Sequence, residues 1–94
     1  GDIVADKISL ECPDSEKERV IEELDGALPD QIADREIAEI VTLDGFKLLL
    51  EDGSWLLVRP SGTEPAMRVY AEAASQERAD ALLSAGRDLV APLI

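Results

Sequence analysis

Two Asp-Gly pairs divide the middle of the chain into short apolar runs. Asp44-Gly45 and Asp52-Gly53-Ser54 separate the runs at residues 37–43, 46–51 and 55–59. An Asp-Gly pair between two such runs is a strong short-range signal for a β-hairpin, because aspartate and glycine tolerate the backbone angles that tight turns need. The spacing therefore predicts a three-stranded antiparallel meander.

Two further segments extend the predicted sheet. Residues 67–73 alternate in polarity, and the side chains that this pattern places on the core side are Met67, Val69, Ala71 and Ala73. The other side is polar, with Arg68, Tyr70 and Glu72. This alternation predicts a fourth strand. Residues 7–11 fit a short strand at the edge of the sheet.

Two helices are predicted, one between residues 7–11 and the meander and one after the strand at residues 67–73. Ser15 and Glu18 fit a capping box at the start of the first helix, and Gly26 with Pro29 ends it. Its apolar residues at helical spacing are Val20, Ile21, Leu24, Ala27 and Leu28. Ser75 caps the second helix, whose apolar stripe, with Gly86 on the same side, is Ala79, Leu82, Leu83, Leu89, Val90 and Leu93.

These elements predict an α+β fold. We expect an antiparallel sheet of about four strands, with the two helices packed on one of its faces. A chain of 94 residues with 46% hydrophobic composition is expected to form a single domain, residues 1–94, without disulfides or metal ions. Trp55 is expected to pack in or beside the core.

The charge and the cysteine content limit the class of protein. The chain has 21 acidic and 9 basic residues, a net charge of -12, which disfavours nucleic acid and anionic membranes as partners. A phosphorylated small molecule is still compatible, because salt confines long-range fields to about 10 Å. The single cysteine, Cys12, and the lack of a long apolar run or a signal-peptide pattern at the N-terminus predict a cytoplasmic protein in which Cys12 is buried or half-buried. The acidic excess suits a salty cytoplasm or ordinary solubility.

No catalytic constellation is found in the sequence. The chain has no histidine, which removes the commonest general base, the usual hydrolase triads and most zinc sites. Its acidic residues are scattered over predicted helix exteriors, where solvated charges are the usual case. The nucleotide-binding glycine motifs are absent. We therefore predict no catalytic and no metal-binding residue in this chain.

The segment RPSGTEP, residues 59–65, has the composition of an anion-binding loop. Arg59 ends a predicted strand and offers a planar fork of donors to a phosphate group. Gly62 permits a positive φ, which would turn the N–H groups of Ser61, Gly62 and Thr63 into one concave nest. The hydroxyls of Ser61 and Thr63 add two donors. These features predict a phosphate site at the end of the sheet.

A structural role explains the same loop. Its prolines and glycine could simply set a rigid strand connection, with Arg59 paired to Glu64 on the surface. Spacing alone does not decide between the two interpretations, because short loop motifs often match by chance. Arg68 is a weaker candidate for a phosphate contact, since it could equally pair with Glu64 or Glu72.

The segments Asp52–Pro65 and Arg68–Ala73 closely resemble the C-terminal domain of the α-D-phosphohexomutases. This family includes phosphoglucomutase, phosphomannomutase and phosphoglucosamine mutase. Its phosphate loop has the form Arg-x-Ser-Gly/Asn-Thr, which implies substrate phosphate contacts at Arg59, Ser61, Gly62 and Thr63, with Glu64 and Arg68 as accessory candidates. The resemblance also implies a TATA-binding-protein-like fold that closes over the active site of a four-domain enzyme.

The resemblance implies that this chain is one part of such an enzyme. The family's phosphorylated serine, its magnesium-binding aspartates and its sugar-reading Gly-Glu-x-Ser-Gly loop belong to other domains and do not occur here. The implied parent is an isomerase of carbohydrate metabolism that interconverts hexose 1-phosphates and 6-phosphates, with Mg²⁺ and a sugar bisphosphate intermediate. The implied partners of this chain are a phosphorylated hexose and the other domains, and the chain alone is expected to be inactive. The alternative is a stand-alone protein-interaction module with the loop as scaffold, which a large exposed apolar patch would favour.

Overall fold

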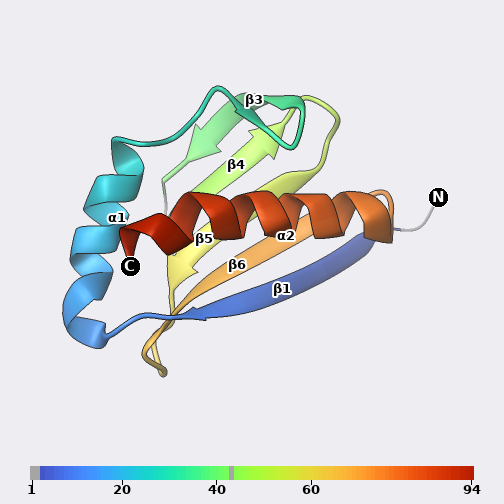
Figure 1. The fold of residues 1–94 in the computed structure, drawn as a ribbon. Coiled ribbons are helices and arrows are strands. Elements are labelled where there is room, and N and C mark those ends of the chain that lie inside the picture. Colours follow the sequence, from blue (N-terminus) through green and yellow to red (C-terminus); the bar gives the residue numbers. More distant parts are fainter. Residues whose placement is uncertain (1–2, 43) are drawn as a thin grey trace.

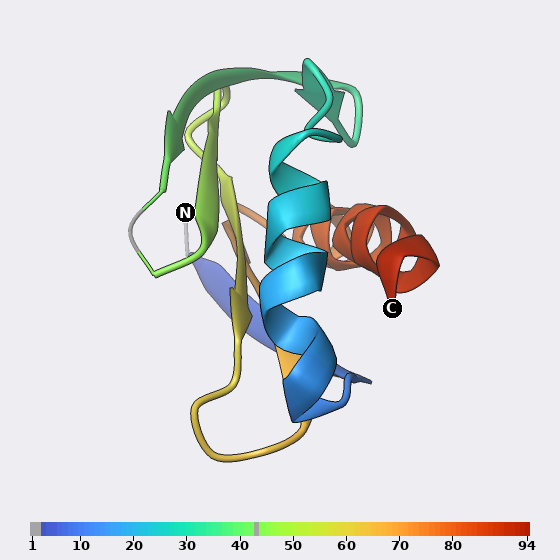
Figure 2. The same cartoon turned by 90° about the vertical axis from the view of Figure 1, so that its left-hand side faces the viewer.

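The computed structural model describes residues 3–42 and 44–94. Within these residues, six strands form one antiparallel sheet in the spatial order β1-β6-β5-β4-β3-β2, and both helices lie on the same side of it (Figure 1, Figure 2). The strands are β1 (Val4–Glu11), β2 (Gln31–Ile32), β3 (Arg35–Val41), β4 (Phe46–Leu50), β5 (Trp55–Pro60) and β6 (Ala66–Ala73). The helices are α1 (Lys17–Asp25) and α2 (Gln76–Val90), with single 3-10 turns at η1 (Asp14–Glu16) and η2 (Ala91–Leu93).

The predicted meander and fourth strand are confirmed. Strands β3, β4 and β5 pair in sequence, β6 lies beside β5, and β1 forms an edge of the sheet as predicted. The turn at Asp44-Gly45 has positive φ at both residues, 61° and 135°. The first predicted run ended at Leu43, which lies outside the described residues.

The sheet has six strands, so the prediction of about four was too low. Strand β1 begins at Val4 rather than at residue 7, and the two-residue strand β2 was not predicted. A tight turn joins β2 to β3, with φ of 48° at Ala33 and 66° at Asp34. Because neither residue is glycine or asparagine, the sequence carried no hairpin signal at this position.

The predicted capping box at Ser15 is wrong. Residues 14–16 form the 3-10 turn η1, in which the Glu16 amide donates to the Pro13 carbonyl, and α1 begins only at Lys17 without a side-chain cap. Ser15 therefore lies inside a helical turn, not in the extended conformation that a capping residue needs. Ala27, predicted on the buried face, is exposed because the helix ends at Asp25 and its periodicity stops there.

One hydrophobic core fills the space between the sheet and the helices. The four predicted core-side residues of β6 are buried, and so is Cys12. The predicted cap of α2 is confirmed, since the Ser75 hydroxyl accepts a hydrogen bond from the Arg78 amide at 3.1 Å. Trp55, in contrast, is half-buried on the sheet face away from the helices and is not part of the core. Alternation along β5 explains this position, because the next residue, Leu56, faces the core.

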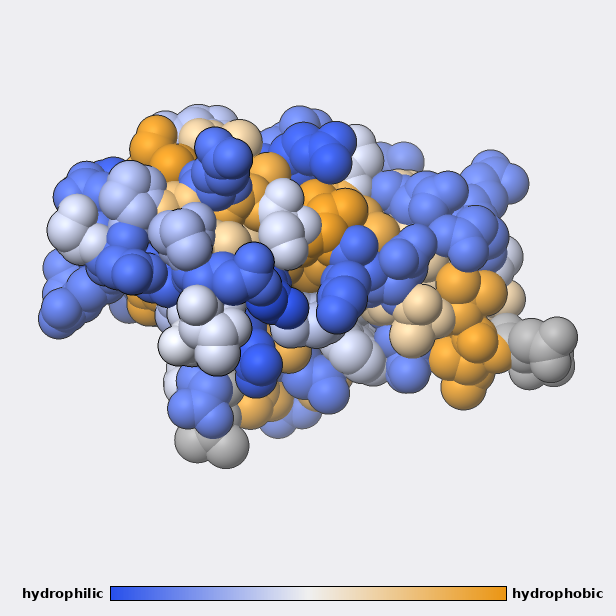
Figure 3. All heavy atoms as spheres, turned by 90° about the horizontal axis from the view of Figure 1, so that it is seen from below, coloured by the Kyte–Doolittle hydropathy of each residue, from blue (hydrophilic) through white to orange (hydrophobic). Residues whose placement is uncertain are grey.

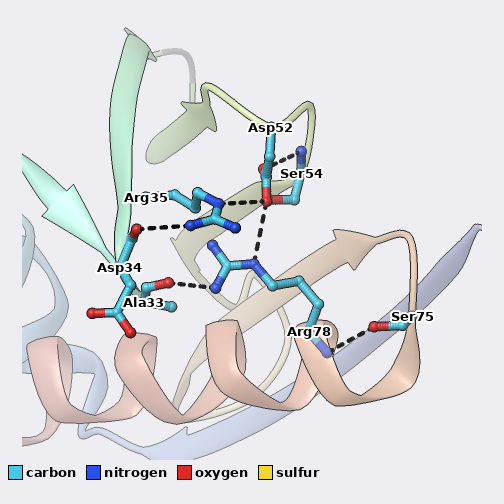
Figure 4. A network of polar contacts seen from close by, with 7 residues as sticks. All are labelled: Ala33, Asp34, Arg35, Asp52, Ser54, Ser75 and Arg78. Carbon is cyan, nitrogen blue, oxygen red and sulfur yellow. Dashed lines mark hydrogen bonds and ion pairs between the residues drawn. The ribbon is translucent and has the colours of Figure 1, made fainter.

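Asp52 joins three parts of the fold (Figure 4). One carboxylate oxygen accepts hydrogen bonds from the amide and hydroxyl of Ser54, and the other lies 3.3 Å from Nε of Arg78 and 3.7 Å from Nε of Arg35. Arg78 also donates to the Ala33 carbonyl, so it links α2 to the β2–β3 turn. Partial burial raises the pKa of Asp52, but the Ser54 hydrogen bonds and the two arginine charges outweigh burial and hold this pKa below its ordinary value.

Gly86 lets α2 approach the sheet closely, and its replacement should destabilise the fold. A Cβ at this position would lie 2.7 Å from Cγ1 of Val69 and 3.2 Å from Cδ1 of Leu56. We expect Gly86→Ala to lower the free energy of unfolding by about 1 to 3 kcal/mol, measured by denaturant unfolding. Gly26→Ala is the matched control, because its Cβ would come no closer than 3.8 Å to the Glu23 carbonyl. Equal losses in the two variants would contradict the close approach.

Asp52 should make stability dependent on acidic pH. Because its folded-state pKa lies below the ordinary value of 3.8, its contribution is complete above that value and is lost as the pH falls through the lower folded pKa. We therefore expect Asp52→Asn to be less stable than wild type at neutral pH but to lose less stability on acidification. Unfolding free energies measured from neutral pH to about pH 2 test this. Asp88→Asn, at an exposed position on α2, is the control. If the free energies of unfolding of wild type and Asp52→Asn fall equally as the pH is lowered, Asp52 does not contribute to the pH dependence of stability.

Candidate functional site

The loop between β5 and β6 lies beyond one end of the sheet, beside the start of α1 (Figure 2). Of the predicted phosphate contacts, Arg59 lies near the end of β5, and Ser61, Gly62 and Thr63 lie in the loop that follows Pro60. Arg59 follows the buried Val58, so alternation along the strand turns Arg59 to the face that the helices leave open. The sheet therefore sets the direction in which the arginine leaves the fold.

The loop uses most of its own amides internally. Ser61 is buried, and its hydroxyl accepts hydrogen bonds from the amides of Thr63 at 3.3 Å and Glu64 at 3.1 Å. The Ser61 amide itself donates to the Ala66 carbonyl at 2.9 Å. The predicted nest of amides from Ser61, Gly62 and Thr63 is therefore wrong for two of its three members.

The predicted positive φ at Gly62 is also wrong. Among the described glycines, positive φ occurs only at Gly45 and Gly53. The Ser61 hydroxyl, rather than a left-handed glycine, closes the turn, because it satisfies two consecutive amides from within the loop. Gly62 keeps its amide without an intramolecular partner among the hydrogen bonds of the described residues.

Arg59 is exposed and is not held by a carboxylate within the described part of the chain. Its guanidinium lies over the ring of Tyr70, 5.6 Å from the ring centre. The predicted scaffold pair between Arg59 and Glu64 is wrong, because Glu64 pairs with Arg68 instead. Glu72, the other carboxylate considered for Arg68, accepts a hydrogen bond from the Trp55 indole at 2.9 Å.

One pocket brings Arg59 and Gly62 together. It has a volume of about 490 Å³ and is lined by Ile21, Asp44, Gly45, Arg59, Pro60 and Gly62. Its walls come from α1, from the turn between β3 and β4, from the end of β5 and from the start of the loop. Ser61 and Thr63 are not among the lining residues. The structure thus places two of the four predicted contacts at a shared opening and gives Ser61 an internal role.

Gly45 is a site residue that sequence analysis missed. A Cβ at this position would lie 2.3 Å from the Val58 carbonyl oxygen and 2.8 Å from Cβ of Arg59, and its φ is 135°. The Asp-Gly pair predicted a turn but did not show what the turn touches. Only glycine allows the β3–β4 turn to press against the backbone that carries Arg59.

Lys17 is a second residue that sequence analysis missed. Its ammonium group, at the first position of α1, lies 2.7 Å from the Ser61 carbonyl and 2.6 Å from the Glu64 carbonyl. It also pairs with Asp14 at 2.6 Å. The contacts with the loop join positions 44 and 47 residues apart, so no local pattern could have found them.

The described residues do not form a metal site. Within residues 3–42 and 44–94, no group of three or more His, Cys, Asp or Glu side chains is placed to hold a metal ion. In the same part of the chain, no helix has the length and apolar character to cross a membrane.

Comparison with known proteins identifies a family. The family model described as "Phosphoglucomutase/phosphomannomutase, C-terminal domain" matches residues 8–88. A phosphopentomutase of Thermococcus kodakarensis is 39% identical over 88 residues, which cover 94% of this chain and 19% of that protein. A probable phosphoglucosamine mutase of Methanothermobacter thermautotrophicus is 43% identical over 76 residues, which cover 81% of this chain and 16% of that protein.

A solved structure shares the fold. The crystal structure of a phosphoglucomutase/phosphomannomutase family protein from Burkholderia thailandensis superposes with a TM-score of 0.72 and 20% sequence identity. The match covers 99% of this chain and 18% of that chain. This chain therefore spans less than a fifth of the length of the three proteins compared.

Substitution by alanine should destabilise the fold at Gly45 but not at Gly62. We expect Gly45→Ala to displace the backbone at Arg59 or to destabilise the fold by at least about 1 to 3 kcal/mol, since a Cβ overlaps backbone atoms and φ is unfavourable. Gly62→Ala should leave stability within about 0.5 kcal/mol, because its φ is not positive and no atom lies within 4 Å of the added Cβ. Denaturant unfolding and amide NMR spectra measure both effects. A loss at Gly62 as large as that at Gly45 would show that the loop does need glycine's conformational freedom.

Proposed function

The chain belongs to the phosphoglucomutase/phosphomannomutase family, as its C-terminal domain, and from this we propose that it binds the phosphate group of a phosphorylated sugar. The single observation that carries the proposal is that one pocket is lined both by Arg59, which forms no ion pair within the described residues, and by Gly62, whose amide has no intramolecular partner there. Arginine recognises phosphate through two parallel hydrogen bonds, and a backbone amide adds a directed donor. Thr63 does not line this pocket in the structure, and we include its hydroxyl in the proposal because the family resemblance implies a phosphate contact at this position.

The sequence suggested that Ser61 contacts the phosphate, whereas in this proposal Ser61 supports the loop. Its hydroxyl accepts from two loop amides, so it holds the loop in shape while its own oxygen is occupied. Arg68 forms an ion pair with Glu64, so in this proposal it supports the loop and does not contact the phosphate. The direct contacts that we propose are therefore Arg59, Gly62 and Thr63, and the supporting residues are Ser61, Glu64 and Arg68.

A site of this kind suits a phosphoryl-transferring mutase. We propose that the parent enzyme interconverts the 1-phosphate and 6-phosphate of a hexose and that this domain binds the phosphate that is not reacting. The two relatives are named for a pentose phosphate and for a glucosamine phosphate, so the group common to both names is the phosphate. A pocket that contacts only phosphate can receive the substrate in either orientation, which positions it for transfer at both ends.

The isolated domain should bind phosphate weakly. Each charge-assisted hydrogen bond contributes about 1.5 to 3 kcal/mol. Association and side-chain ordering cost several kcal/mol, so an open half-site reaches roughly millimolar affinity. Turnover requires groups that the other parts of the proposed parent supply.

A protein-interaction module is the alternative, and it needs a continuous apolar surface. On the side of the molecule seen in Figure 3, hydrophobic residues of the described part form separate groups among charged ones. The large hydrophobic residues that are most exposed are Ile3, Ile40, Val41 and Ile94. Ile40 and Val41 lie on β3, which three strands separate from β1, and Ile3 directly precedes β1. This scatter favours the phosphate proposal.

Arg59→Ala should abolish phosphate binding by the domain. We expect inorganic phosphate, glucose 1-phosphate and mannose 1-phosphate to shift the amide resonances of the loop similarly at millimolar concentration, because the sugar is not contacted. In Arg59→Ala these shifts should vanish, since the strongest donor is gone. An amide NMR titration at constant ionic strength measures the effect.

Arg87→Ala is the matched control for this titration. It removes the same charge from an exposed position on α2 and should titrate like wild type. If Arg59→Ala also titrates like wild type, the loop is not the phosphate site. The ligand is raised to tens of millimolar, which is well above the weakest expected dissociation constant. If no amide resonance of residues 59–65 shifts at that concentration, the result favours the alternative of a protein-interaction module.

A further inference from the structure

The ammonium group of Lys17 is fully occupied by the loop and by Asp14. Its three acceptors are Asp14 Oδ1 at 2.6 Å, the Ser61 carbonyl at 2.7 Å and the Glu64 carbonyl at 2.6 Å. An ammonium group has three N–H donors, so this arrangement uses all of them. The side chain is only 15% exposed. Lys17 therefore has no donor left for a ligand, and any effect on the site must pass through the loop.

The contact with Ser61 fixes the direction of the next amide. In a trans peptide, the carbonyl and the following N–H point in opposite directions, and the described residues contain no cis peptide bond. Because the Ser61 carbonyl points to Lys17, the Gly62 N–H points away from Lys17. Gly62 lines the pocket that Arg59 also lines. Lys17 thus orients the peptide whose donor is proposed to bind the phosphate.

The Gly62 amide is the one unbonded donor of the loop backbone in the described structure. The Ser61 amide donates to the Ala66 carbonyl, and the Thr63 and Glu64 amides donate to the Ser61 hydroxyl. Pro65 has no N–H. A single amide therefore remains for an anion, and its direction depends on the Ser61–Gly62 peptide.

Electrostatics favours this orientation. A carbonyl that accepts from a cation is polarised, which strengthens the donor at the other end of the same peptide. Asp14 offsets the charge of Lys17, so Lys17 adds little net positive charge to the site. Without Lys17, both carbonyls would lose a charged partner. The Glu64 carbonyl would keep its hydrogen bond from the Ala66 amide at 2.8 Å, whereas the Ser61 carbonyl would be free to turn toward the pocket, where its oxygen would repel phosphate.

We propose that Lys17 is a positioning residue of the phosphate site, which directs the Gly62 amide into the pocket by binding the Ser61 and Glu64 carbonyls. The inference rests on the proposed phosphate-binding function, which it deepens by assigning the backbone donor and the residue that orients it. Lys17 couples the start of α1 to the loop, so the site includes an element far away in the sequence. Its predicted signature is a phosphate response concentrated on one amide.

The test compares Lys17→Met with Lys7→Met in the 94-residue chain. Both variants remove one lysine charge with the same replacement, and Lys7 lies on the edge strand β1, outside the phosphate pocket. Inorganic phosphate is titrated into each labelled protein at constant ionic strength, and unfolding curves check that each is folded. In wild type and Lys7→Met, we expect the Gly62 amide to shift more than those of Ser61, Thr63 and Glu64. In folded Lys17→Met, we expect this selective shift to disappear and the dissociation constant to rise about tenfold or more, which corresponds to the loss of about one oriented, charge-assisted hydrogen bond.

Equal binding and an unchanged Gly62 shift in folded Lys17→Met would overturn the inference. If Lys17→Met does not fold, scalar couplings across the hydrogen bonds of wild type decide the matter. Couplings from Lys17 Nζ to the carbonyl carbons of Ser61 and Glu64, together with the selective Gly62 shift, would support the inference, and the absence of either would overturn it. If wild type does not respond to phosphate at all, the proposed function fails, whereas the couplings still report whether Lys17 holds the loop.

Discussion

Burial of only one face of the sheet is the constraint on which the rest of the structure depends. Both helices lie against that face, so alternation along β5 turns Leu56 and Val58 inward and leaves Arg59 on the open side. A shift of one residue in the pairing of β5 would send the arginine into the core and a core residue into water. The packing of the core therefore selects the direction of the proposed phosphate contact.

Patterns confined to neighbouring residues predicted much of the fold. The Asp-Gly turns, the alternation of β6 and the Ser75 cap of α2 each depend on a few adjacent residues, and each was confirmed. The prediction of a capping box at Ser15 was wrong because Ser15 lies inside the 3-10 turn η1. Strand β2 was missed because two residues are too few for a periodic signal and because its turn places Ala33 and Asp34 at positive φ without glycine.

The candidate site was predicted in part for the same reason. Arg59 could be placed at the end of a strand from the sequence, and the structure brings it to a pocket with Gly62. The amide nest failed because the Ser61 hydroxyl competes for the same amides, a choice that composition does not reveal. The contacts of Gly45 with Arg59 and of Lys17 with the loop join distant parts of the chain, so only the folded structure shows them.

The hydrogen bonds of Lys17 mean that the seven-residue loop is not a portable module. Its shape is maintained by the ammonium group of Lys17, which lies 44 residues before Ser61 in the sequence. A graft of residues 59–65 onto another hairpin would carry the motif but leave two of its carbonyls without their cation. The loop motif alone is therefore weaker evidence for this loop structure than the motif together with a lysine at the start of the packed helix.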